Sequence, residues 1–319
     1  LYTYEPYDIR DKAFSIAALN TKNLTWQGMG KGQLPTQRHH HNVFFNAFQD
    51  TIFLFGGYGS FKYHSSFYKF DRSANQWLPV AFSGDKIHPR FFSASGRAET
   101  PDEVYLFGGF GNESGSQVVG GKEYYDLYRI NLKTHRVKKC WSIKLPERKF
   151  VPANNLILSA DKKFFYVLCY PHEVAKTHLN LYKFTVADGK FEKVASTIPV
   201  TSEKIETDIN LFYSADSQQF YCCIQEFTDP NRSSIRVLTL DAPPISQVAY
   251  LKHSEKPKSA SIFWIAASCV CALVIIGGVW FYLSRNKRIK TDIALTNLSS
   301  NAKSNYEQPI NSDKVVADK

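Results

Sequence analysis

Residues 51–58, Thr-Ile-Phe-Leu-Phe-Gly-Gly-Tyr, and residues 104–110, Val-Tyr-Leu-Phe-Gly-Gly-Phe, decide the fold, because the second run repeats the first. Each run is short and apolar, as is typical of a β-strand, and stops at two glycines. Since glycine has no Cβ, such a pair lets the chain turn sharply or approach a neighbouring sheet closely. The glycine pair of the second run follows that of the first by 52 residues, and this distance indicates an internal repeat.

A second repeated feature is a hairpin in which a large apolar residue follows the end of the preceding strand by seven positions. The four pairs are Leu19 and Trp26, Phe70 and Trp77, Ile130 and Val137, and Phe184 and Phe191. Their first members are separated by 51, 60 and 54 residues. The longer middle interval contains the Gly- and Ser-rich segment 111–121, which we expect to form an extended loop.

Two further strand candidates precede each of the last three hairpins. They are residues 43–48 and 51–55, 91–95 and 104–107, and 155–158 and 164–168. A last unit follows, with strand candidates at 209–213, 220–224, 235–240 and 248–251. Four antiparallel strands in roughly 50 residues is the period of a propeller blade. The pattern therefore predicts three full blades, a fourth, and the outer hairpin of an earlier one.

These units resemble the kelch-repeat family, whose blade is marked by a strand ending in Gly-Gly, a Tyr-rich strand, and then an aromatic residue, usually Trp. Residues 51–77 and 104–141 carry all three marks, the second with an insertion. The marker residues are Gly56, Gly57, Trp77, Gly108, Gly109 and Trp141. The later units depart from the pattern, since Tyr170-Pro171 and Gln225-Glu226 occupy the Gly-Gly position and Phe191 replaces Trp.

The resemblance covers residues 1 to 251 and implies an all-β, kelch-type β-propeller with four to five visible blades. An unrelated β-sandwich with accidental repeats is the alternative fold. The chain begins at Leu1 without an initiator or a signal peptide. We therefore expect a fragment or mature form whose propeller is incomplete at the N-terminus.

Residues 260–283 form a run of 24 residues without a charged side chain. A helix of this length would be about 36 Å long, enough to cross a bilayer. Trp264 lies near one end, and Trp280 and Tyr282 lie near the other, as interfacial aromatic residues do. We predict a single transmembrane helix over residues 260–284, joined to the propeller by a tether at 252–259; a buried core helix is the alternative.

The flanks of this segment predict its orientation. Arg285, Lys287 and Arg288 follow it closely, whereas the lysines before it are diluted by Glu255. Because positive residues favour the cytoplasmic side, we expect the propeller outside and the C-terminus in the cytoplasm. Residues 285–319 combine this basic juxtamembrane segment with a polar tail of disordered character.

The sequence contains no motif that points to catalysis, a cofactor or a metal. There is no nucleophile elbow, phosphate loop or paired-histidine zinc motif, so we predict no catalytic residues and leave an enzymatic role open. His39, His40 and His41 alternate in direction along an extended chain, and at most two could share a face. The formal charge is +10, but no groove-reading motif accompanies it, and nucleic acid is not an expected partner.

Six cysteines are present without a disulfide framework. Free thiols are the simple interpretation, and a bridge between Cys140 and Cys169 stays open if the domain is exported. Cys222 and Cys223 are adjacent in a predicted strand and should point to opposite faces.

These features predict an extracytoplasmic recognition or sensor module, held by one membrane span and coupled to a cytoplasmic signalling region. The layout resembles the outer part of bacterial membrane-tethered regulators. We expect the ligand, a protein or a carbohydrate, to bind at loops 31–41 and 111–121. The alternatives are a carbohydrate-binding or carbohydrate-active propeller, with aromatic and acidic side chains around a central pocket, and a surface adhesion protein.

Overall fold

The computed structural model describes residues 2–4, 16–30, 38–46, 49–145, 149–201, 208–229, 232–254, 273–285 and 287. The chain divides into two compact units, Leu1–Ser254 and Glu255–Lys319. Every strand that the structure assigns lies in the first unit.

The described strands of the first unit form successive sets of antiparallel strands, which we number as blades. Blades 3 and 4 share one ten-stranded sheet, because their first strands pair in parallel at Ser95 and Asn155. Blade 1 contains β1 (Tyr2–Tyr4), β2 (Ile16–Asn20) and β3 (Thr25–Met29), and blade 2 contains β4 (Asn42–Asn46), β5 (Thr51–Phe55), β8 (Phe67–Asp71) and β9 (Gln76–Val80). Blade 3 contains β12 (Ala94–Arg97), β13 (Glu103–Gly111), β14 (Lys122–Asn131) and β15 (Arg136–Ser142). Blade 4 contains β16 (Val151–Leu158), β17 (Phe164–Tyr170), β18 (Lys176–Thr185) and β19 (Phe191–Thr201), and blade 5 contains β20 (Asp208–Ser214), β21 (Gln219–Asp229) and β22 (Arg232–Asp241).

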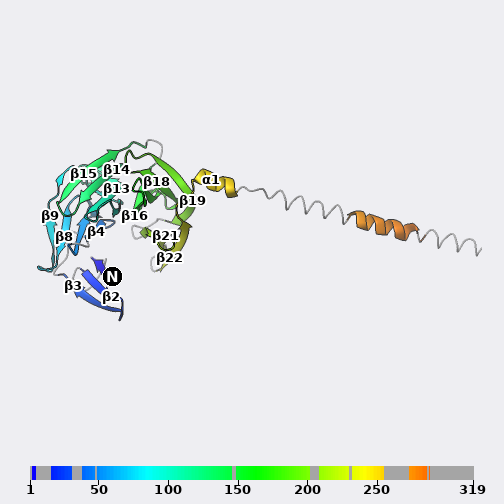
Figure 1. Cartoon of the computed structure of the whole chain (residues 1–319), viewed down its shortest axis with the longest axis horizontal. Helices are drawn as coiled ribbons and strands as arrows, with labels where there is room; N and C mark the ends of the chain where they lie inside the picture. The colour runs from blue at the N-terminus through cyan, green and yellow to red at the C-terminus, as the bar shows by residue number, and fades with distance from the viewer. Residues whose placement is uncertain are drawn as a thin grey trace, which may run out of the picture. The chain divides into compact units, whose positions relative to one another are not determined.

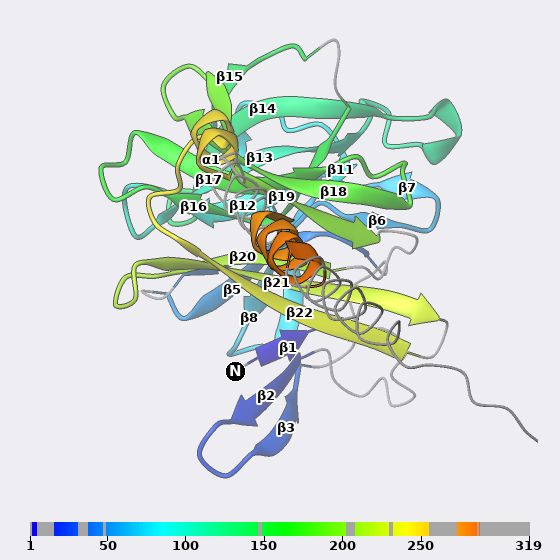
Figure 2. The same ribbon diagram turned by 90° about the vertical axis from the view of Figure 1, so that its right-hand side faces the viewer.

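Short strands extend the connections between and within the blades. They are β6 (Tyr58–Gly59), β7 (Lys62–Tyr63), β10 (Ser83–Gly84) and β11 (Arg90–Phe91). Within this unit the blades follow one another in chain order, from β2 and β3 to β21 and β22 (Figure 1). The first strands of neighbouring blades lie side by side, β4 with β12, β12 with β16, and β16 with β20. Figure 2 shows β21 and β22 running together as the hairpin of blade 5. This arrangement confirms the predicted all-β fold and fits a β-propeller.

The seven-residue spacing in the sequence follows from the register of the hairpins, because the two residues of each pair lie opposite each other on neighbouring strands. Leu19 lies opposite Trp26, Phe70 opposite Trp77, Ile130 opposite Val137, and Phe184 opposite Phe191. Such cross-strand pairs stabilise a hairpin because their side chains lie on the same face of the sheet. In blade 2 the rings of Phe70 and Trp77 meet edge to face, with centroids 5.5 Å apart.

Four apolar clusters form the core, and each lies between two neighbouring blades. The cluster between blades 1 and 2 contains Ile16, Ile52, Leu54, Phe70 and Trp77. The next contains Phe53, Phe55, Val104, Leu106 and Ile130, and the third contains Tyr105, Phe107, Phe165, Val167 and Phe184. Between blades 4 and 5 lie Tyr166, Leu168, Leu211, Phe220 and Ile224. The blades are therefore stacked face to face, as in a propeller.

The predicted fourth strand of blade 5, residues 248–251, is wrong. These residues belong to α1 (Gln247–Ser254). Just before the helix, Ala195 N donates to Ile245 O at 2.9 Å, and Ser246 forms a β-bridge with Val194. The chain after β22 is thus bonded to the outer strand of blade 4, so it does not pair with β22.

The predicted strand 91–95 is interrupted. Phe92 adopts a φ of +56°, which breaks the extended backbone between β11 and β12. β11 pairs with the end of β13, whereas β12 pairs with its beginning. The break turns this segment towards the glycine pair of blade 3.

In the second unit, residues 273–285 are helical. Trp280 and Tyr282 are largely exposed on this helix, and Arg285 and Lys287 are exposed at its end. Residues 260–272, which include Trp264, lie outside the described residues, as does Arg288. Among the helices that are described, none combines the length and the apolar character required to cross a membrane.

Candidate functional site

One end of blades 2 to 4 is built from the turns after the second strand of each blade and the segments that enter the first strand. Hydrogen bonds join these segments. His39 and Tyr58 exchange backbone bonds of 2.7 and 2.9 Å, and Gly57 N donates to Arg90 O at 2.9 Å. We call this surface the loop face; its residues are 38–41, 56–66, 88–92, 108–121 and 170–175.

The glycine pairs allow these segments to pass close to one another. Gly57 has a φ of +93°, and a Cβ there would lie 2.9 Å from the Cβ of His41. Gly109 has a φ of +115°, and a Cβ there would lie 2.5 Å from Ser93 Oγ. Both positions combine a left-handed backbone with no room for a side chain, so they require glycine.

Two buried arginines hold the glycine pairs. Arg38 Nη1 donates to Gly56 O and Arg90 Nη1 donates to Gly108 O, each at 3.0 Å. Each arginine precedes its glycine by 18 residues. Neither arginine belongs to a motif that the sequence indicated, although their common spacing in two repeats was a signal that could have found them.

The arginine of blade 3 is neutralised by a carboxylate. Arg90 forms a two-pronged ion pair with Asp126, at 2.6 Å for Nη1–Oδ1 and 3.1 Å for Nη2–Oδ2. Arg90 is 1% and Asp126 3% exposed. The guanidinium also lies 4.1 Å from the ring centroid of Tyr124, a cation–π contact.

In blade 2 the corresponding partner is a hydroxyl. Arg38 Nη2 donates to Ser66 Oγ at 2.8 Å, and burial lowers the pKa of Arg38. Its guanidinium lies 4.9 Å from the ring centroid of Tyr68. The same arginine therefore appears in two blades, with a stronger electrostatic partner in blade 3.

Aromatic rings cover the loop face between these arginines. Phe91 is at the centre, with centroid distances of 5.5 Å to Tyr58, 5.6 Å to Tyr63, 4.3 Å to Phe92 and 5.9 Å to Phe110. We call these five residues the aromatic cluster. They come from blades 2 and 3 and from the segment between them, so ring packing links the two blades.

Three exposed apolar side chains lie on the loops of blades 2 and 3, and we call Phe61, Val118 and Val119 the apolar tip. They are 75%, 93% and 71% exposed. Val118 and Val119 belong to η1 (Gln117–Val119), a 3-10 turn inside the predicted loop 111–121.

Three contacts fasten these loops together. Gln117 N donates to Phe61 O at 3.2 Å, Lys62 forms a β-bridge with Ser116, and Tyr58 Oη donates to Gln117 Oε1 at 2.8 Å. The apolar tip is therefore held in an ordered frame. Of the other predicted loop, residues 31–37 lie outside the described part of the chain.

Comparison with known families matches this architecture. A sequence model described as the KLHDC2/KLHL20/DRC7 Kelch-repeats domain matches residues 8–207, more than half of the chain. The chain belongs to this kelch-repeat family. No curated protein matches it.

The structure places the two kelch tryptophans between blades rather than on the loop face. Trp77 is buried in the cluster between blades 1 and 2. Trp141 packs against the cluster between blades 3 and 4 and donates from Nε1 to Val186 O at 2.8 Å. Both have structural contacts, whereas the glycine markers shape the loop face.

The histidine triplet takes part in the packing of the kelch loops. His39 pairs with Tyr58 through its backbone, and the ring of His40 lies 4.3 Å from that of Phe92. His41 Nδ1 donates to Arg38 O at 3.1 Å, and burial lowers the pKa of His41 to about 4.

The cysteines of the described blades are free thiols. Cys140 and Cys169 form no disulfide, and burial raises the pKa of each. Cys222 is buried and Cys223 is half-buried, as expected for neighbours in a strand. Cys269 and Cys271 lie outside the described residues.

We predict that Asp126→Asn destabilises the propeller strongly. Loss of the carboxylate charge leaves Arg90 buried without its counter-charge, which costs about 3–5 kcal/mol. The matched control is Asp50→Asn, since Asp50 pairs with Arg72 at 2.9 Å but 60% of its side chain is exposed. We expect a change of at most about 1 kcal/mol for the control. Thermal unfolding followed by near-UV circular dichroism measures both, and equal losses would contradict the prediction.

Proposed function

We propose that this kelch propeller is a recognition module that binds a protein ligand through the apolar tip. Kelch repeats are characteristic of β-propellers that mediate protein interaction, and the family and the stacked blades support that general role. The observation that carries the specific proposal is the exposure of Phe61, Val118 and Val119 together on two bonded loops. Exposed apolar side chains that are gathered into one patch mark interaction surfaces.

The surroundings of the apolar tip favour tight binding. Because the two loops are already bonded to each other, little conformational entropy is lost when a partner orders them. Tyr58 in β6 and Tyr63 in β7 lie on either side of Phe61 in the chain, and both rings pack against Phe91 of the aromatic cluster. A rigid apolar centre with a polar rim, here Asn112, Glu113 and Lys62, is the usual anatomy of a protein interface.

We predict that a photo-crosslinking amino acid at position 118 yields a discrete protein adduct in cells that express the chain. Phe61→Ser should reduce this adduct at least tenfold, because the substitution removes the largest apolar side chain of the tip. The control is Leu24→Ser, since Leu24 is 74% exposed but lies in the turn of blade 1. A yield that survives Phe61→Ser, or falls equally with Leu24→Ser, would refute the proposal. An adduct with a surface protein of another cell would instead assign the tip to adhesion.

We further propose that residues 260–284 anchor the propeller outside the cytoplasm by one membrane span and couple it to a cytoplasmic signalling region. The support is the uncharged run 260–283, its terminal Trp264, Trp280 and Tyr282, and the basic flank that begins at Arg285. Within the described helix, residues 273–276 are Leu-Val-Ile-Ile, so this part of the run is apolar at every position.

We predict that protease added to intact cells digests the propeller and leaves an epitope after Lys319 protected. The basic residues after the span favour retention of that end in the cytoplasm. Detergent lysis is the control, since it should expose the epitope as well. Digestion of the epitope with protection of the propeller would reverse the orientation, and release of the chain by carbonate extraction would exclude a span.

Carbohydrate binding is a second candidate, favoured by a cavity of about 440 Å³ between blades 4 and 5. Its walls include aromatic rings, one acid and one base: Phe164, Tyr166, Tyr213, Phe220, Asp161 and Lys183. The hypothesis from the sequence expected such groups around a central pocket, whereas this cavity lies between adjacent blades. Aromatic faces combined with a few polar groups suit a small ligand such as a sugar.

We predict that, if this cavity binds carbohydrate, Tyr213→Ala abolishes retention of the chain on the glycan that it recognises in an array. Phe212→Ala is the control. Phe212 is 48% and Tyr213 42% exposed, but only Tyr213 lines the cavity. Absence of glycan binding, or an equal effect of both variants, would leave the protein ligand as the function.

A further inference from the structure

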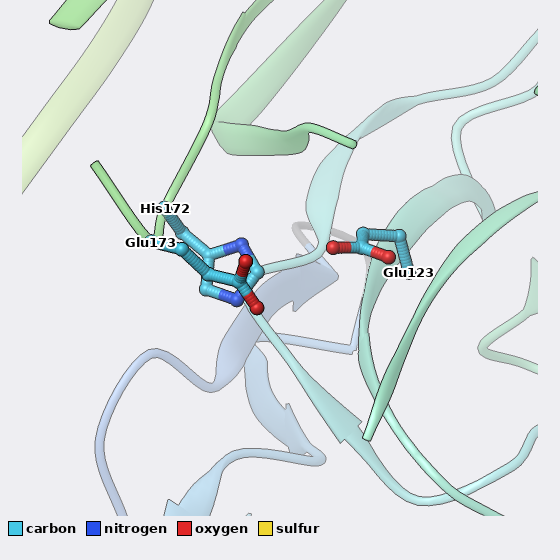
Figure 3. A group of neighbouring side chains, drawn as sticks. All are labelled: Glu123, His172 and Glu173. Atoms are coloured by element: carbon cyan, nitrogen blue, oxygen red, sulfur yellow. The ribbon is translucent and has the colours of Figure 1, made fainter. Parts of the chain in front are cut away.

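Glu123, His172 and Glu173 form a group of potential metal ligands where blades 3 and 4 meet on the loop face. Each offers one ligand atom, and these atoms lie within 4.8 Å of one another. Glu123 is near the start of β14, and the other two residues follow β17. Figure 3 shows the two segments on opposite sides of the group, with the Glu123 carboxylate directed towards His172. Neither segment could make the group alone.

One carboxylate of this group has a buried oxygen without a hydrogen-bond partner. Glu123 Oε1 is buried and accepts no hydrogen bond. In the described part of the chain, no arginine or lysine nitrogen lies within ion-pair distance of Glu123 or Glu173. A buried carboxylate oxygen without a partner is unfavourable, so a bound cation would relieve it.

Aromatic side chains surround the imidazole of His172. Its ring lies 4.6 Å from that of Phe110 and 5.7 Å from that of Phe92. Packing against these two rings positions the imidazole, whose ring nitrogens are common metal ligands.

We propose that Glu123, His172 and Glu173 bind one divalent transition-metal ion of the zinc type. One neutral imidazole and two carboxylates balance the charge of a divalent ion, and mixed nitrogen and oxygen donors suit zinc. Tetrahedral ligands at 2.0–2.2 Å from the metal are about 3.4 Å apart, so the donors must approach by at most about 1.4 Å. Rotation of the exposed Glu173 side chain can supply such a movement.

Three protein ligands leave one coordination position open to the loop face. The metal would also fasten blade 3 to blade 4, where the repeat lacks its glycine pair. Tyr170 and Pro171 stand at that position, and His172 and Glu173 follow directly. The departure from the kelch pattern thus supplies two of the three ligands.

The test is competition for Zn²⁺ between a chromophoric chelator and the full 319-residue chain in detergent. We expect binding at this position to weaken at least tenfold with Glu123→Gln or Glu173→Gln and to be lost with His172→Ala. Glu113→Gln is the matched control, because the side chain of Glu113 is 70% exposed on the same face and lies outside the group. Zinc that other histidines bind is common to the parent chain and the variants, so it cancels when their zinc binding is compared. Far-UV circular dichroism checks that each variant is folded.

Thermal unfolding provides a second readout. Zn²⁺ should raise the melting temperature of the parent chain and of Glu113→Gln, but not that of His172→Ala, because only a metal bound to the folded state stabilises it. A chelator should reverse the shift. Equal zinc affinity in the parent and in His172→Ala, or no stoichiometric binding by the parent, would overturn the proposal.

Discussion

The burial of apolar side chains between neighbouring blades is the contact on which the rest of this structure depends. In β5, Ile52 and Leu54 face the cluster towards blade 1, whereas Phe53 and Phe55 face the cluster towards blade 3. Since successive side chains of a strand point to opposite faces, a central strand between two blades must be apolar at every position. This explains why the run 51–55 does not alternate with polar residues. A blade without a neighbour would expose half of these side chains.

The loop face follows from this stacking. At one end of the stacked sheets, the turns after the second strands lie close to the segments that enter the same blade and the next one. A Cβ at Gly57 or Gly109 would meet the segment entering the same blade, and a Cβ at Gly56 would lie 2.9 Å from Arg90 O of the next. The same crowding removes the carbonyls of Gly56 and Gly108 from water, and the two arginines satisfy them. Burial of the guanidinium of Arg90 in turn requires the Asp126 carboxylate. The glycine turns and the buried ion pair are thus both consequences of the stacking of the blades.

The proposed binding features lie where the chain departs from its own repeat. The apolar tip is formed with the insertion 111–121, which lengthens the interval between hairpins. Two of the proposed metal ligands follow the replacement of Gly-Gly by Tyr170-Pro171. The repeated residues are committed to stacking, since each contacts two blades or shapes a turn. The residues that break the pattern are free of this constraint and can contact a ligand.

The sequence by itself determined the blade period, the paired hairpin residues and the kelch family, because strand alternation and glycine turns are local properties that repeat along the chain. The predicted strand at residues 248–251 was wrong, because an apolar run of four residues fits a short helix as well as a strand. The hydrogen bond from Ala195 N to Ile245 O decides between them. Only the tertiary structure brings Arg90 to Asp126, Phe61 to Gln117, and Glu123 to His172. These partners are far apart in the sequence. Strand pairing within blade 3 brings Arg90 to Asp126, and the stacking of successive blades brings together the other two pairs.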